Sequence, residues 1–164
     1  TFRDGENIKN GGIDIEIIFF PRHTPDEVAF YVIQEKILIT GDLIKVPKDK
    51  KSYGQTPFIP VFNSPYSSFE DAMSSLKKIS DLDVETLMPG HRQQITGEKL
   101  IKSCLVQMEE EMVKKKRLVA NLKNRGMADA EILKYVIRDI SKSYPNCSQT
   151  DQMFYAYLLL KSSV

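Results

Sequence analysis

The spacing of apolar residues changes once along this chain of 164 residues, and that change limits what the chain can fold into. Before residue 97, apolar residues form short runs separated by turns, a pattern typical of β-strands. From Gly97 onward they recur at three- and four-residue steps, which is typical of amphipathic helices. The sequence therefore predicts an α/β part over residues 1–96, followed by a small helical tail over residues 97–164.

The first part contains four strand-like segments. Residues 13–20 alternate apolar and acidic residues and then become fully apolar, which indicates a strand whose second half is buried. Residues 28–33 and 36–40 predict a β-hairpin, and residues 84–88 predict a short strand broken by Pro89-Gly90. Residues 45–65 hold four prolines and show no period, so we expect a long loop there.

Helix signals follow that loop. Ser67 and Glu70 have the spacing of a capping box, and they predict a helix that runs to about Ser80. In the tail, a first helix is expected from Gly97 to a stop at Asn124-Arg125-Gly126. Two further helices are expected, at about residues 129–142 and about residues 150–161.

The first tail helix carries a run of charges, Glu109 to Glu111 followed by Lys114 to Arg117. The four-residue spacing predicts ion pairs from Glu110 to Lys114 and from Glu111 to Lys115. We interpret this run as an exposed helix face. A basic ridge that contacts RNA or a partner protein is the alternative.

The overall charge limits the partners. The net charge is +1, from 23 basic and 22 acidic residues, which gives no support to nonspecific binding of nucleic acid or acidic membranes. The longest apolar runs are far shorter than the roughly 20 residues that a membrane helix needs. The two cysteines, Cys104 and Cys147, have neither metal-ligand nor redox spacing. We expect a cytoplasmic protein with a small-molecule substrate rather than nucleic acid.

Both histidines of the chain follow predicted strands. His23 follows the strand at residues 13–20, His91 follows the strand at residues 84–88, and Asp42 follows the second strand of the hairpin. Loops at strand ends bring ligands together from distant parts of an α/β chain. Two imidazoles and a carboxylate suit a borderline metal such as zinc. Each residue alone is typical of an ordinary turn, but the three together predict a metal site.

These motifs resemble those of the metallo-β-lactamase-fold hydrolases. The segment from Phe19 to Asp42 is similar to the family's Pro-Gly-His-Thr-Pro-Gly motif, hairpin and Thr-Gly-Asp motif, and residues 88–91 are similar to its last metal motif. The resemblance implies the C-terminal half of an αββα sandwich. The helical tail resembles that of a thioester-hydrolase-like and RNase-like branch of the family.

The resemblance also implies residue roles. His23 would bind a first metal ion and His91 a second, Asp42 would bridge them, and Thr24 and Thr40 are candidates to hydrogen-bond the ligands. Zinc is the expected metal, with two ions in the complete protein, and iron or manganese are the alternatives. The implied reaction is attack by a metal-bound hydroxide on an ester, thioester, lactone or phosphodiester.

Some positions depart from the family pattern. The family's other ligands come from an upstream His-x-His-x-Asp-His motif, which this chain does not contain. Arg22 stands where the family usually has glycine, and Arg92 stands where glycine is frequent. We therefore expect the chain by itself to be inactive and to form homo-oligomers through its apolar strands. The alternative is a non-catalytic, degenerate module or interaction domain.

Overall fold

Among the residues that the computed structural model describes (2–20, 27–41, 44–45, 59–60, 68–90, 93–144 and 147–162), six strands form one sheet. Its strand order is β1-β2-β3-β4-β7-β8. The strands are β1 (Asn7–Asn10), β2 (Ile13–Phe19), β3 (Val28–Val32), β4 (Ile37–Gly41), β7 (Thr86–Pro89) and β8 (Ile95–Thr96). A separate pair is formed by β5 (Ile44–Lys45) and β6 (Ile59–Pro60).

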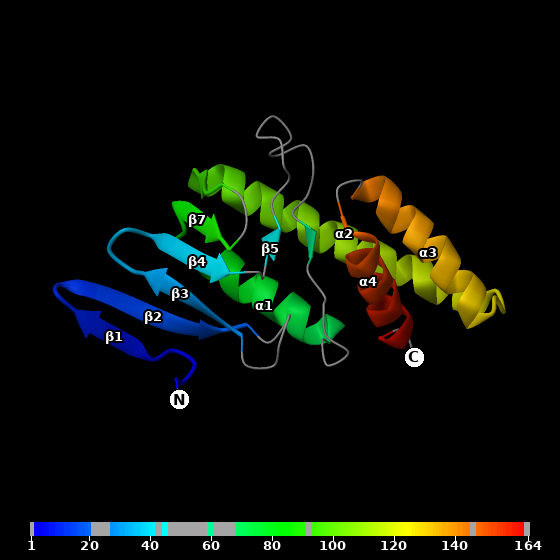
Figure 1. Cartoon of the computed structure of the whole chain (residues 1–164), viewed down its shortest axis with the longest axis horizontal. Coiled ribbons are helices and arrows are strands. Elements are labelled where there is room, and N and C mark those ends of the chain that lie inside the picture. The colour runs from blue at the N-terminus through cyan, green and yellow to red at the C-terminus, as the bar shows by residue number, and fades with distance from the viewer. Residues whose placement is uncertain are drawn as a thin grey trace.

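Strand direction decides where the strand-end loops lie. β2 and β3 are antiparallel, β3 and β4 form the antiparallel hairpin that the sequence predicts, and β4 and β7 are parallel. Consequently β2, β4 and β7 all run in one direction, as their arrows show in Figure 1. The carboxyl ends of these three strands therefore lie at the same end of the sheet.

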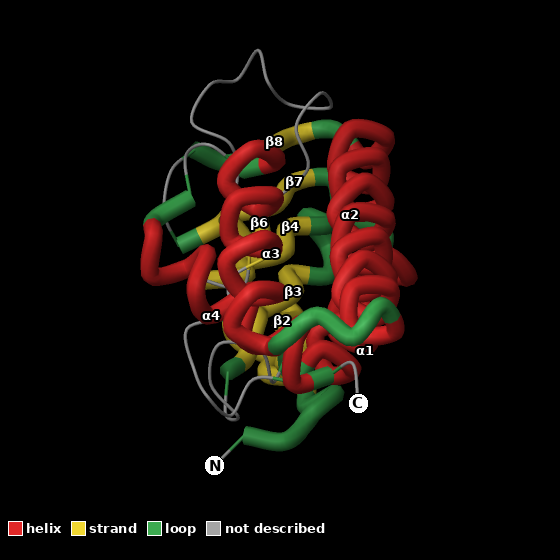
Figure 2. The backbone as a smooth tube through the Cα atoms, turned by 90° about the vertical axis from the view of Figure 1, so that its right-hand side faces the viewer, coloured by secondary structure: helices red, strands yellow, loops and turns green. Residues whose placement is uncertain are grey.

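Two helices cover one face of the sheet (Figure 2). They are α1 (Phe69–Asp81) and the long α2 (Glu98–Asn124). Tyr31, Leu38 and Leu87 point from three neighbouring strands into the core that these helices close. α1 and α2 contribute residues to the same buried cluster, including Phe69, Leu76, Ile79, Ile101, Leu105 and Met108.

The tail of residues 97–164 contains α2 together with α3 (Asp129–Ser143) and α4 (Gln149–Lys161). α3 and α4 lie beyond the sheet edge at which β4 and β7 end (Figure 1). Ile132, Val136 and Ile140 of α3 are buried in the same core cluster as Val119 and Leu122 of α2. Within the described ranges, no helix combines the length and the apolar character that crossing a membrane requires.

The start of α1 differs from the prediction by one residue. Ser68, not Ser67, is the N-cap, and its Oγ accepts a hydrogen bond of 3.1 Å from the backbone N–H of Asp71. The prediction of Ser67 with Glu70 was therefore wrong in register. Two consecutive serines precede two consecutive acidic residues, so the capping pattern fits both registers and the sequence alone does not choose between them.

The shortest strands were not predicted. β1 is made of Asn, Ile, Lys and Asn, and four mostly polar residues at a sheet edge show no apolar alternation. β8 has two residues, and β5 and β6 lie at and inside the segment that the sequence marked as a loop. Pairing with another strand makes these segments strands, since their own sequence pattern does not: β1 and β8 pair with longer neighbours, and β5 and β6 pair with each other.

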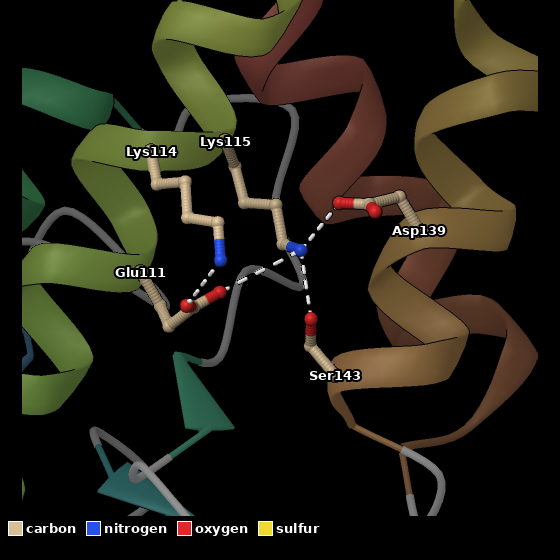
Figure 3. Close-up of polar contacts among 5 residues, drawn as sticks. All are labelled: Glu111, Lys114, Lys115, Asp139 and Ser143. Carbon is tan, nitrogen blue, oxygen red and sulfur yellow. Dashed lines mark hydrogen bonds and ion pairs between the residues drawn. The ribbon is translucent and has the colours of Figure 1, made fainter.

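Lys115 is not on an exposed helix face, so that interpretation of the charge run was wrong for this residue. Its side chain is 2% exposed and reaches from α2 to α3, where Nζ donates to Asp139 and, at 2.7 Å, to Ser143 (Figure 3). Glu111 lies 3.6 Å away and completes the predicted pair with Lys115. Lys114 pairs with this same Glu111, at 3.1 Å, and not with Glu110 as predicted.

Candidate metal centre

The three candidate ligands follow β2, β4 and β7, whose carboxyl ends lie at the same end of the sheet. His23, Asp42 and His91, like Thr24, lie outside the described residues, so their side-chain positions remain predictions. The strands before them are described, and the register aligns Ile17, Ile39 and Met88 through Phe30 across the sheet. Carboxyl ends of parallel strands are where α/β proteins bind ligands.

β4 and β7 are joined at their ends by one backbone hydrogen bond. The N–H of Gly90 donates to the carbonyl oxygen of Gly41 at 2.6 Å. Asp42 and His91 are the next residues after these two glycines, and consecutive Cα atoms are about 3.8 Å apart. The two candidate ligands therefore start from a pair of residues in direct contact.

Gly41 is in the left-handed region, with φ of 54°, a conformation that residues with a Cβ adopt only with strain. The register between β4 and β7 shifts between Ile39 and Gly41, so the irregularity falls at Thr40. Bulges of this kind re-aim side chains and occur often beside active sites. The backbone thus turns sharply just before Asp42.

A backbone hydrogen bond joins the two residues that flank the segment carrying His23. Phe20 is completely buried, and its N–H donates to the carbonyl oxygen of Glu27 at 2.9 Å. That bond closes the loop of residues 21–26 at its two ends. β2 is two strands away from β4, about 10 Å at the usual strand spacing. The six residues from 21 to 26 are a stretch of chain long enough to span this distance.

Thr40 is the one predicted site residue that the structure describes. Its side chain is 0% exposed, and its Oγ1 has no hydrogen-bond partner among the described residues. A buried hydroxyl needs a partner, and leaving it without one costs about 1–3 kcal/mol. Thr40 precedes Asp42 by two residues, so a carboxylate in the loop is a suitable acceptor. This hydroxyl fits a position beside a metal ligand, where such groups orient the ligand.

The candidate donor set itself also fits a metal. Neutral imidazoles and a carboxylate are ordinary zinc ligands. Within the described part of the chain, no cluster of three or more histidine, cysteine, aspartate or glutamate residues is placed to hold a metal ion. Cys104 and Cys147 are not joined in a disulfide. The described residues therefore offer no competing site.

The family model of the metallo-beta-lactamase superfamily matches residues 1–91, which is more than half of the chain. A beta-lactamase-like protein 2 homolog of Caenorhabditis elegans is 28% identical over 120 residues, covering 73% of this chain and 35% of that protein. A linear primary-alkylsulfatase of a Pseudomonas species is 21% identical over 140 residues, covering 83% of this chain and 25% of that protein. The chain thus spans well under half the length of these curated relatives.

Solved structures share the fold. A metallo-beta-lactamase family protein from Thermus thermophilus superimposes with a TM-score of 0.65 at 18% identity, over 98% of this chain and 48% of that one. A beta-lactamase domain protein from Burkholderia ambifaria gives a TM-score of 0.63 at 14% identity, over 99% of this chain and 47% of that one. Both alignments include the helical tail. With the family match over its first 91 residues, the chain belongs to the metallo-beta-lactamase superfamily.

Proposed function

We propose that this chain supplies His23, Asp42 and His91 to the metal centre of a metal-dependent hydrolase that acts on an ester, thioester, lactone or phosphodiester. The observation that carries the proposal is the shared direction of β2, β4 and β7, together with the bond from Gly90 to Gly41. Membership of the superfamily supports metal-dependent hydrolysis in general, and the substrate class is our proposal.

The chain's own residues have separate tasks in this proposal. His23 and His91 donate neutral imidazole nitrogens, and Asp42 adds the negative charge that offsets the metal and can bridge two ions. The Thr40 hydroxyl donates to the Asp42 carboxylate and fixes its orientation. When bound, zinc lowers the pKa of a coordinated water and polarises the substrate oxygen. Iron and manganese are the alternatives to zinc that elemental analysis distinguishes.

A small-molecule substrate is favoured over nucleic acid by the state of three of the four basic residues at positions 114–117 of α2. Lys114 pairs with Glu111, Lys115 is buried, and Lys116 pairs with Glu70 at 2.7 Å. Cations that already have carboxylate partners contribute little to binding phosphates. Because an alkylsulfatase is among the relatives, the substrate panel should include alkyl sulfate esters beside thioesters, lactones and phosphodiesters.

The test is zinc affinity, measured by competition with a chromophoric chelator. Three protein ligands that are split across two metal positions leave each ion weakly held, so we expect weak, substoichiometric zinc binding to this chain and little turnover. Replacing His23, Asp42 or His91 by alanine should weaken binding about tenfold or more in each case. The matched control is Asp83→Ala. Asp83 pairs at 2.5 Å with Lys36, which lies in the turn between β3 and β4, at the opposite end of the sheet from the candidate ligands.

Unchanged zinc affinity in all three ligand variants would refute the proposal and favour the non-catalytic alternative. Tight binding of two ions with rapid turnover by this chain alone would contradict the expectation that further ligands are needed. The same panel of substrates, offered to the longest form of the protein that can be expressed, tests the hydrolase activity.

A further inference from the structure

β2 continues beyond the end of its edge partner. β1 pairs with residues 13–16 of β2, and the preceding turn adds two bonds to Ile17. In these two bonds, the Gly5 N–H donates to the backbone carbonyl oxygen of Ile17 at 2.8 Å, and the Ile17 N–H donates to the backbone carbonyl oxygen of Glu6 at 2.8 Å. Among the described residues, no strand lies beside Phe19 on this side. Strand-edge backbone groups need other partners there.

Two side chains provide those partners. The N–H of Phe19 donates to Oδ1 of Asp4 at 2.8 Å, and Nζ of Lys78 in α1 donates to the Phe19 carbonyl oxygen at 3.3 Å. Lys78 Nζ also donates to Oδ2 of Asp4 at 2.8 Å. Both outward-facing backbone groups of Phe19 are thus bonded to charged groups, which make stronger hydrogen bonds than neutral ones.

Asp4 is ionised in this arrangement at neutral pH. Partial burial by itself raises the pKa of the Asp4 carboxyl, but the hydrogen bonds from Lys78 and from the Phe19 N–H outweigh it and hold the pKa below its usual value. The contact therefore ties three segments together, namely the N-terminal turn, the end of β2 and the last turn of α1.

We propose that Asp4 and Lys78 form a clamp on Phe19 that positions the loop carrying His23, so that both are positioning residues for the metal centre. The clamp holds Phe19 from one edge of β2, and the Phe20–Glu27 bond holds the next residue from the other edge. The loop of residues 21–26 begins directly after them. This inference rests on the proposed role of His23 as a ligand.

The exposure of the ion pair argues for positioning over general stability. The side chains of Lys78 and Asp4 are 42% and 51% exposed, and ion pairs this exposed add little to folding stability. A ligand loop is more sensitive than the whole fold to small displacements, because metal affinity depends on the groups that orient the ligands. Loss of the clamp should therefore weaken the protection of nearby backbone amides and lower the metal affinity, with little effect on the stability of the whole fold.

The experiment compares Asp4→Ala and Lys78→Met with the wild-type chain by amide hydrogen exchange and by zinc titration. The Phe20 amide reports the base of the loop, and we expect its exchange to be about tenfold faster in both variants while the β3–β4 amides are unchanged. Zinc binding should weaken about three- to tenfold, less than when a group bonded directly to a ligand is lost. Asp83→Asn, in the similarly exposed Lys36–Asp83 pair, is the control.

A charge-exchanged variant, Asp4→Lys with Lys78→Asp, separates the clamp from the ion pair. It keeps both charges but sets a donor against the Phe19 N–H and an acceptor against its carbonyl, so we expect no rescue of Phe20 protection. Unchanged Phe20 exchange in the single variants, or full rescue in the exchanged variant, would overturn the clamp. Faster exchange with unchanged zinc affinity would overturn the positioning role. Absence of zinc binding by the wild type would refute the proposed function, while the exchange data still decide the clamp.

Discussion

Thr40 has a hydroxyl group that the described residues leave without a hydrogen-bond partner, in a position with no access to solvent. Packing does not require a hydroxyl there, because valine has the same shape. A protein keeps a buried group of this kind when something outside ordinary packing uses it, and its cost to stability is about 1–3 kcal/mol. Its place two residues before Asp42 in the sequence is consistent with a hydrogen bond to Asp42, the proposed metal ligand.

Thr40→Val is therefore expected to have opposite effects on folding and on metal binding. Removing the buried hydroxyl should stabilise the zinc-depleted chain by about 1 kcal/mol, measured by urea denaturation. Zinc affinity should fall about tenfold, because Asp42 loses the group that orients it. Thr40→Ser keeps the hydroxyl and should bind zinc nearly as the wild type does. A valine variant that is less stable and binds zinc normally contradicts this role.

At the scale of the element, helices were predicted more accurately than strands. α2, α3 and α4 begin and end within one or two residues of the predicted bounds, because a helix shows its period and its stop signals within its own sequence. β1 and β8 were missed because a short edge strand depends on its neighbour. Lys115 was missed because a run of four basic residues does not indicate which one faces the core.

Lys115 links α2 to α3, and its loss should weaken that contact. Lys115→Met keeps the buried stem but leaves Asp139 without this cation and Glu111 with Lys114 as its cation, so we expect destabilisation of about 1–3 kcal/mol in urea denaturation. We expect a loss of stability of about 1 kcal/mol rather than about 3 kcal/mol, because both carboxylates are partly exposed and water can solvate them once this cation is gone. Lys114→Met is the matched control on the solvent side and should leave the midpoint unchanged. Equal effects of the two substitutions would contradict the assignment.

The contact between α1 and α2 should depend on pH. The hydrogen bond from Lys116 holds the pKa of Glu70 below its usual value of 4.5, and Lys116 Nζ also lies 4.5 Å from the centre of the Phe69 ring. A lowered folded-state pKa stabilises the fold above about pH 4.5, and this contribution is lost as the pH falls through the folded pKa. Glu70→Gln should thus be less stable than the wild type at pH 7, by less than about 1 kcal/mol.

Denaturation at pH 7 and at about pH 2.5 checks this, because the difference between Glu70→Gln and the wild type should shrink toward zero in acid. A difference that is the same at both pH values would mean that Glu70 acts through packing and not through its charge.

At the scale of the whole molecule, the two faces of the sheet are unlike. α1 and α2 cover one face, whereas the other carries the row of Ile17, Phe30, Ile39 and Met88 with no described helix over it, and Ile17 in this row is fully buried. Ile39 is 39% exposed and Met88 is 37% exposed. The sequence predicted association through the apolar strands, and this stays a prediction. Which partner covers this face cannot be read from the pattern, since apolar burial is non-directional.

We expect this face to drive self-association of the chain into dimers or larger assemblies. Sedimentation velocity should show a mean size that rises with concentration, and Ile39→Lys with Met88→Lys should shift the chain toward monomer. Val106→Lys, which replaces another exposed apolar residue on α2, is the control and should leave the size unchanged. A wild-type chain that remains monomeric at high concentration contradicts this expectation.

The central claim is that three strand ends deliver His23, Asp42 and His91 to one metal centre. Anomalous X-ray diffraction at the zinc edge, from crystals of the zinc-loaded protein, tests it most directly. The three side-chain tips should lie within roughly 7 Å of one another, because bridged metals are about 3.5–4 Å apart and ligand bonds are near 2 Å. The anomalous peak should lie at bonding distance from at least two of these side chains. A peak elsewhere, or any of the three side chains directed to another face of the molecule, would contradict the claim.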